Sequence, residues 1–186
     1  MATREDIKRA YLKLGKAKGA DNVSLSDIAN EVGIRKASIY AHFESALAIR
    51  AQVLSDGMEA AKAIQPQMDF KAKDAGTLLY GFAENLTYGF SQEDISCFWA
   101  ICCQLRHTDK AFAQAASRIE KMTEARVRVA IEFCVQKGWF NVPDTDSASA
   151  FFTARLLPCM TKAALDDSTA FDDLENLIDD SVELFS

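Results

Sequence analysis

The sequence predicts an all-α protein with an N-terminal helix-turn-helix domain of three helices and a larger C-terminal helical bundle. Apolar residues recur at spacings of three and four along most of the chain, and no segment of strand length alternates apolar and polar residues with β-branched enrichment. A glycine separates two short helical segments near the N-terminus. The 186 residues are 49% hydrophobic and 26% charged, with 8 Gly and 3 Pro, which excludes collagen-like, low-complexity and disordered classes.

The first two helices are marked by an apolar face and by a start signal. Ile7, Tyr11 and Leu14 share one face of the first helix, which we expect to fray from residue 15 onward. Ser24 can accept a hydrogen bond from the backbone three residues on, and Asp27 favours the positive start of a helix. The second helix is therefore expected to begin at this pair.

Gly33 interrupts the helical pattern after this second helix. Residues 34–43 then form another short segment with Ile39 and Phe43 on one face. Two short helices joined by a glycine turn are a helix-turn-helix candidate. A longer amphipathic helix is expected over residues 46–64.

The remainder, after a loop over residues 65–73, is predicted to be helical throughout. Its apolar faces carry, in chain order, Leu78, Phe82 and Leu86; Ile95, Phe98, Trp99 and Cys102; Phe112, Ala115, Ile119, Met122, Val129 and Phe133; Phe151, Phe152 and Leu156; and Leu174, Ile178, Val182 and Phe185. Gly138 after Lys137 reads as a helix end.

Charge is distributed unevenly along the chain, whose net charge is −6. Residues 1–50 carry nine Lys or Arg against six Asp or Glu, whereas residues 51–186 carry twelve against twenty-one. A basic head on an acidic body is expected when one end meets phosphate, because local potential steers a polyanion. Random scatter of surface charge is the alternative.

A set of residues between positions 24 and 49 carries a family resemblance. The matching pieces are Ser24, Ile28-Ala29, Gly33-Ile34, Ser38-Ile39-Tyr40, His42-Phe43 and Ser45. In order and spacing they resemble the DNA-binding region of TetR-family transcriptional repressors. The resemblance implies a DNA-binding domain at residues 1–45, a ligand-binding and dimerisation domain at residues 46–186, and release of a palindromic operator by a small-molecule effector.

The second short helix carries small side chains on its outer face, so it can enter a major groove about 12 Å wide. The predicted DNA-binding residues are Ser24, Arg35, Lys36, Ala37, Ser38, Tyr40 and His42. The resemblance assigns Tyr40 and His42 to phosphate contacts. Alternatively, Tyr40 packs against the first helix, His42 is an ordinary exposed polar residue, and Arg35 with Lys36 is a solvated pair.

One position departs from the family pattern. Ala46 stands where the family usually has lysine, and Leu47 follows in place of an acidic residue. The loss of one phosphate contact lowers the salt dependence of binding by about one unit of log–log slope. An all-helical dimeric sensor or interaction protein that has lost DNA binding is therefore the alternative function.

The apolar stripes of the body predict an apolar cavity for a small-molecule effector, apolar or aromatic in character. The predicted ligand-binding residues are Phe82, Leu86, Trp99, Cys102, Met122, Arg126 and Phe133. Alternatively, the same apolar stripes form a packed core that binds no ligand. Arg126 and Arg155 interrupt apolar stripes, and each could pair with an anionic ligand, reach solvent or pair with a neighbouring acidic residue.

The last two helices carry much apolar surface for a chain end, which predicts a two-fold four-helix interface in a homodimer. Alternatively, these helices only cover their own body. From Asp166 onward the chain holds eight Asp or Glu and no Lys or Arg.

The remaining signals predict neither an enzyme nor a cofactor or metal. Cys97, Cys102, Cys103, Cys134 and Cys159 lack zinc-site spacing and are expected to be buried reduced thiols. The pair of Cys103 and His107 has no evident third ligand, and His107 has no evident catalytic partner. The absence of an apolar run long enough for a span or a signal peptide predicts a cytoplasmic protein without membrane contact.

Overall fold

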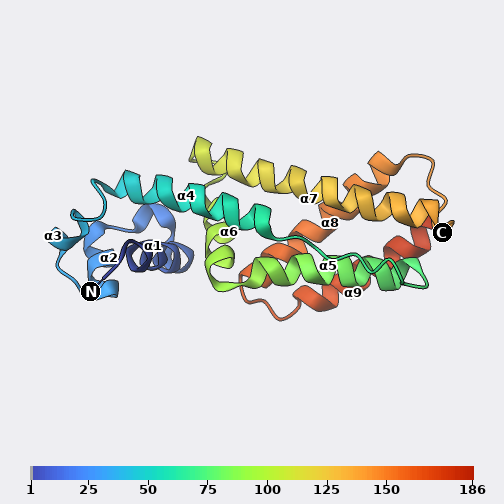
Figure 1. Cartoon of the computed structure of the whole chain (residues 1–186), viewed down its shortest axis with the longest axis horizontal. Helices are drawn as coiled ribbons and strands as arrows, with labels where there is room; N and C mark the ends of the chain where they lie inside the picture. Colours follow the sequence, from blue (N-terminus) through green and yellow to red (C-terminus); the bar gives the residue numbers. More distant parts are fainter. Residues whose placement is uncertain (1) are drawn as a thin grey trace. The chain divides into compact units, whose positions relative to one another are not determined.

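A computed structural model describes residues 2–186 as helices joined by short loops (Figure 1). No strand occurs among these residues, so the all-α prediction is confirmed. None of the described helices is long and apolar enough to cross a membrane. Packing divides the chain into two compact units, the first comprising residues up to Ala61 with Glu93–Ala116 and the second comprising Lys62–Gln92 with Ser117–Ser186. This division reflects compactness alone, and the functional boundary after residue 45 stays a prediction.

The first unit contains the N-terminal helices and one helix from the middle of the chain. Its elements are α1 (Arg4–Lys18), the 3₁₀ turn η1 (Ala20–Asn22), α2 (Leu25–Val32), α3 (Lys36–Ile39), most of α4 (Ala46–Ala63) and α6 (Glu93–Leu105). Helix α1 packs against α2, η1 and α6. The core side chains that are at most 3% exposed include Ile7, Tyr11, Ile28, Ile39, Phe43, Ile49 and Val53.

Helix α1 extends further than the sequence predicts. It continues through Gly15 to Lys18 instead of fraying. Gly15 is buried, and a Cβ at that position would lie 2.7 Å from the Cδ1 of Ile101 on α6. The glycine therefore permits a close approach of the two helices, and this packing keeps the last turn of α1 helical.

The expected start of α2 is confirmed. The Ser24 hydroxyl accepts a hydrogen bond from the Asp27 N–H at 3.1 Å, and the Asp27 carboxylate accepts one from the Ser24 N–H at 2.8 Å. This reciprocal capping box satisfies two N–H groups at the helix start.

Gly33 ends α2 in the left-handed conformation, with φ 74° and ψ 33°. The chain then enters α3, which is shorter than the predicted residues 34–43. After Ile39 the hydrogen bonds change pattern, because the N–H groups of His42 and Phe43 both donate to the Ile39 carbonyl at 2.9 Å. Residues 40–42 are therefore tight turns and not a continued α-helix.

The second unit is built around three helices that lie side by side (Figure 1). They are α5 (Ala75–Ser91), α8 (Thr145–Ala164) and α9 (Ala170–Phe185), and each packs against the other two. The unit also contains most of α7 (Lys110–Gln136). Fully buried side chains include Leu78, Leu79, Phe82, Leu86, Phe90, Phe152, Leu156, Leu174 and Leu177.

The predicted inward face of α7 is wrong in its C-terminal half. Val129 is 54% exposed, and Met122 and Phe133 are half-buried. The buried positions of this part of the helix are instead Thr123, Val127, Ala130, Ile131 and Cys134. At about 100° per residue, this stripe is rotated by about a quarter turn from the predicted one. Both stripes have helical spacing, so only tertiary packing distinguishes them.

Substitution of Gly33 tests the left-handed turn. We expect Gly33→Ala to destabilise the protein by about 1–2 kcal/mol, because a Cβ disfavours this conformation by about that amount. Steric clash does not contribute, since a Cβ at Gly33 would meet no atom within 4 Å. Thermal and urea unfolding measure the change.

Gly81→Ala is the matched control. A Cβ at Gly81 also meets nothing within 4 Å, but this residue is helical, in α5. The control is expected to stabilise the protein by up to about 1 kcal/mol. Destabilisation of both variants by the same amount would contradict the assignment.

Candidate nucleic-acid interface

The candidate interface is the outer side of the α2–α3 pair. Ile28 and Ala29 on α2 and Ile39 on α3 are buried, so the opposite side of α3 is exposed. The exposed predicted residues are Arg35, Lys36, Ala37, Ser38 and Tyr40, whereas His42 is half-buried. Small side chains between two cations and a tyrosine form a narrow surface that suits a groove.

Tyr40 points away from the core, because 54% of its surface is exposed. The alternative that Tyr40 only packs against α1 is therefore not supported. The neighbouring Phe43 is 3% exposed and anchors the following turn. The exposed phenol can therefore donate a hydrogen bond outward.

Ser24 is already engaged within its own helix. Its hydroxyl donates to the Asp27 carboxylate at 2.6 Å, and the same carboxylate lies 2.9 Å from Lys18 Nζ. The hydrogen bonds from Ser24 and the ammonium of Lys18 hold the pKa of Asp27 well below its usual range. A phosphate contact by Ser24 stays a prediction, and it would compete with the capping box.

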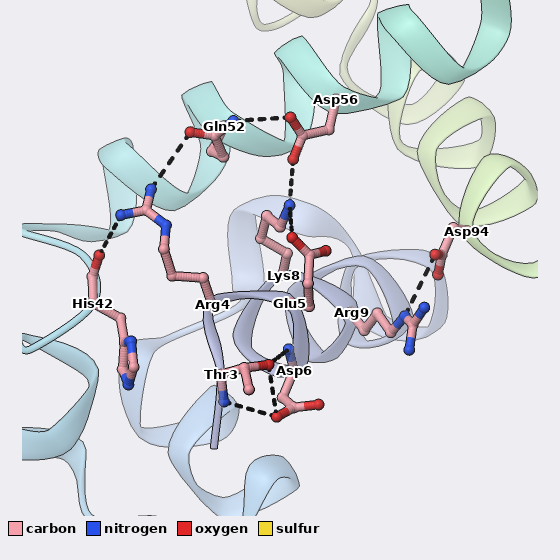
Figure 2. Close-up of polar contacts among 10 residues, drawn as sticks. All are labelled: Thr3, Arg4, Glu5, Asp6, Lys8, Arg9, His42, Gln52, Asp56 and Asp94. Atoms are coloured by element: carbon pink, nitrogen blue, oxygen red, sulfur yellow. Dashed lines mark hydrogen bonds and ion pairs between the residues drawn. The ribbon is translucent and has the colours of Figure 1, made fainter. Parts of the chain in front are cut away.

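Arg4 fixes the end of the α3 segment against α4 (Figure 2). Its Nη1 donates to the His42 carbonyl at 2.8 Å, and its Nη2 lies 3.4 Å from the Gln52 side-chain oxygen. The guanidinium carbon is 4.2 Å from the centroid of the Phe43 ring. One cation at the start of α1 therefore holds the turn that follows Tyr40.

A second cation continues this network toward the core (Figure 2). Lys8 is 9% exposed and pairs with Asp56 on α4 and with Glu5, the latter at 2.7 Å. Gln52 also donates to Asp56, at 2.8 Å. Burial alone would lower the pKa of Lys8, but the hydrogen bonds to Asp56 and Glu5 outweigh it and raise the pKa.

Neither Arg4 nor Lys8 was among the residues predicted from the sequence. The sequence did contain a signal for Arg4, because a cation in the first turn of a helix interacts unfavourably with the helix dipole. Arg4 occupies such a position, at the start of α1. An unfavourable local placement indicates a partner elsewhere in the fold, although it does not identify the partner.

The predicted ligand-binding residues fall into both units. Phe82 and Leu86 on α5 are buried in the second unit, where Met122, Arg126 and Phe133 on α7 are half-buried. The other two, Trp99 and Cys102 on α6, are buried in the first unit. Their common role as a ligand site stays a prediction.

Four of the five cysteines are buried, as expected, and Cys103 is half-buried. Burial raises the pKa of Cys134 to about 12 and also raises that of Cys97, Cys102 and Cys159. These four thiols are therefore protonated and poorly nucleophilic at neutral pH. In the described part of the chain, no three His, Cys, Asp or Glu residues are grouped to hold a metal ion.

Helices α2 and α3, joined by the left-handed turn at Gly33, form a helix-turn-helix. Residues 9–52 match the family model described as bacterial regulatory proteins of the tetR family. No curated protein matches the chain at the level of sequence.

Solved structures of TetR-family regulators share the fold of nearly the whole chain. PfmR from Thermus thermophilus matches with a TM-score of 0.69 and 20% identity, over 95% of this chain and 97% of that one. A regulator from Agrobacterium tumefaciens matches with a TM-score of 0.71 and 16% identity, over 98% and 97%. A regulator from Haloarcula marismortui matches with a TM-score of 0.67 and 15% identity, also over 98% and 97%.

Residues 9–52 are thus a TetR-family helix-turn-helix region, and the chain has the fold of TetR-family transcriptional regulators. The family resemblance that the sequence predicted is confirmed.

Removal of the Arg4 side chain tests its role in holding the turn. We expect Arg4→Ala to increase amide hydrogen exchange at residues 40–45 about fivefold, which corresponds to the loss of about 1 kcal/mol of hydrogen bonding. Arg9→Ala is the control, because Arg9 lies on the same helix and pairs instead with Asp94 at 3.4 Å. If both variants exchange alike in this segment, Arg4 does not hold the turn.

Proposed function

We propose that this chain is a homodimeric transcriptional repressor that binds a palindromic operator and releases it when a small-molecule effector binds the helical body. The observation that carries the proposal is the exposed outer side of α3, backed by the buried Ile39 and Phe43. Residues 1–45 are then the DNA-binding domain, and residues 46–186 bind the effector and form the dimer.

Residues 24–45, which we call the reading head, supply both kinds of contact that DNA recognition requires. Arg35, Lys36, Ala37 and Ser38 are exposed and enter the major groove in this proposal. Tyr40 and His42 hold phosphates on the flanks of the groove, and Ser24 adds a contact from the start of α2. Phosphate contacts set the register, and contacts to base edges supply the specificity.

Dimerisation places two reading heads on one operator. Helices α8 and α9 pack together yet leave Phe151 and Leu184 exposed, at 38% and 61%. Exposed apolar side chains on paired terminal helices suit a two-fold four-helix interface. Two heads are required because one short helix reads too few bases for useful discrimination.

The alternative function is a dimeric sensor that does not bind DNA. One observation favours it, since Leu47 is 74% exposed at the start of α4 and Ala46 before it carries no charge. The position where the family usually anchors a phosphate therefore presents apolar surface. Salt-sensitive operator binding distinguishes the two functions.

A double substitution tests the phosphate contacts. We expect Tyr40→Phe combined with His42→Ala to weaken binding to the DNA upstream of the chain's own gene by about tenfold or more, because hydrogen bonds to charged groups are lost. Fluorescence anisotropy measures the affinity. Tyr88→Phe is the control, since Tyr88 is 61% exposed but lies in the second unit. Equal affinity of the double variant and the control would refute the residue assignment.

A lysine at position 46 tests the place at the start of α4 where the sequence departs from the family pattern. We expect Ala46→Lys to tighten DNA binding and to steepen its salt dependence by about 0.9 log–log units, the value for one added phosphate contact. Ala51→Lys is the control, because it adds the same charge at an exposed position further along α4. An unchanged slope in Ala46→Lys would show that this position does not face the backbone of DNA.

A further inference from the structure

Arg126 on α7 is a half-buried cation without a counter-charge. Its Nη1 is buried and has no hydrogen-bond partner, and its Nη2 donates to the Lys62 carbonyl at 3.2 Å. No carboxylate among the described residues pairs with it, and burial lowers its pKa. By contrast, Arg128 on the same helix lies 2.5 Å from Asp146, and Arg155 on α8 lies 2.6 Å from Asp180.

A second unsatisfied group lies one helical turn away. Thr123 is 1% exposed, and its hydroxyl has no partner. Threonines inside helices usually donate to the carbonyl four residues earlier, as Thr161 does to Leu157 at 2.9 Å. Residues three apart share one side of a helix, so the Thr123 hydroxyl and the Arg126 guanidinium lie on adjacent turns of one side.

The surroundings of the Thr123 hydroxyl are apolar. Ile119 and Val127 are buried one turn on either side of Thr123. A polar group left unsatisfied in such a place is costly, and an unpaired charge is more so. A water molecule can satisfy a hydroxyl, but it supplies no negative charge. An anion, unlike water, can both accept a hydrogen bond from the Arg126 guanidinium and balance its charge.

We propose that Arg126 and Thr123 form the polar end of an effector site that takes the carboxylate of a small apolar molecule. The carboxylate accepts charge-assisted hydrogen bonds from Arg126 and a further one from the Thr123 hydroxyl, while the apolar part of the ligand lies among neighbouring core side chains. This inference rests on the proposed function, because it specifies the chemistry of the effector of the helical body.

Isothermal titration of the full-length chain with matched probes tests the site. The carboxylates are octanoate and phenylacetate, and the uncharged controls are 1-octanol and 2-phenylethanol. We expect the carboxylates to bind the unsubstituted protein, to bind Arg126→Met about ten- to a hundredfold more weakly, and to bind Thr123→Val about fivefold more weakly. The affinity for the two alcohols should be the same in all variants.

Arg128→Met is the matched control, with the same substitution on the same helix, and it should bind the carboxylates as the unsubstituted protein does. Thermal unfolding without ligand gives a second readout. Arg126→Met should unfold at the same or a higher temperature than the unsubstituted protein, because an unpaired buried charge is removed. A larger loss of stability in Arg126→Met than in Arg128→Met would show that the guanidinium is structural, and would overturn the proposal.

Two results of the titration also overturn the inference: no binding of either carboxylate to the unsubstituted protein, or equal binding to Arg126→Met. Operator binding is measured on the same preparations. Specific DNA binding without carboxylate binding removes this inference and leaves the repressor proposal in place. Carboxylate binding that requires Arg126, in a protein that binds no operator, supports the site and refutes the repressor function.

Discussion

The left-handed backbone at Gly33 is the constraint on which the reading head depends. It ends α2 and redirects the chain so that Ile39 enters the core and the opposite side of α3 faces solvent. A residue with a Cβ would disfavour this reversal. The slim exposed surface of α3 therefore follows from one backbone conformation together with one buried side chain.

Arg4 and Lys8 in the first unit and Arg126 in the second differ in how fully their nitrogens are hydrogen-bonded. Near the head, Arg4 and Lys8 are held by carbonyl, amide and carboxylate oxygens from α4 and from the turn after α3. In the helical body, Arg126 has only one carbonyl partner and a buried nitrogen without any. Cations whose hydrogen bonds are satisfied position a rigid element, whereas a half-buried cation with an unsatisfied nitrogen is a candidate binding group.

Local rules predicted the helices well where the signal lay within one turn of the chain. The capping box of Ser24 and Asp27, the stop at Gly33 and the helical character of the whole chain could all be recognised in this way. The extent of α1 and the inward side of α7 could not. Gly15 stays helical because it accommodates Ile101, and Val129 is exposed because other elements select a different stripe of the same helix.

The sequence by itself determined the all-α class, the position of the helix-turn-helix and the residues of its outer surface, because capping, glycine conformation and helical periodicity act over a few residues. Tertiary structure alone decided which stripe of α7 is buried, that Arg4 holds the turn after α3, and that Arg126 and Thr123 lack partners. These features depend on contacts between segments far apart in the chain, such as Arg4 with His42 and Arg126 with Lys62. Spacing along one helix carries no information about such partners.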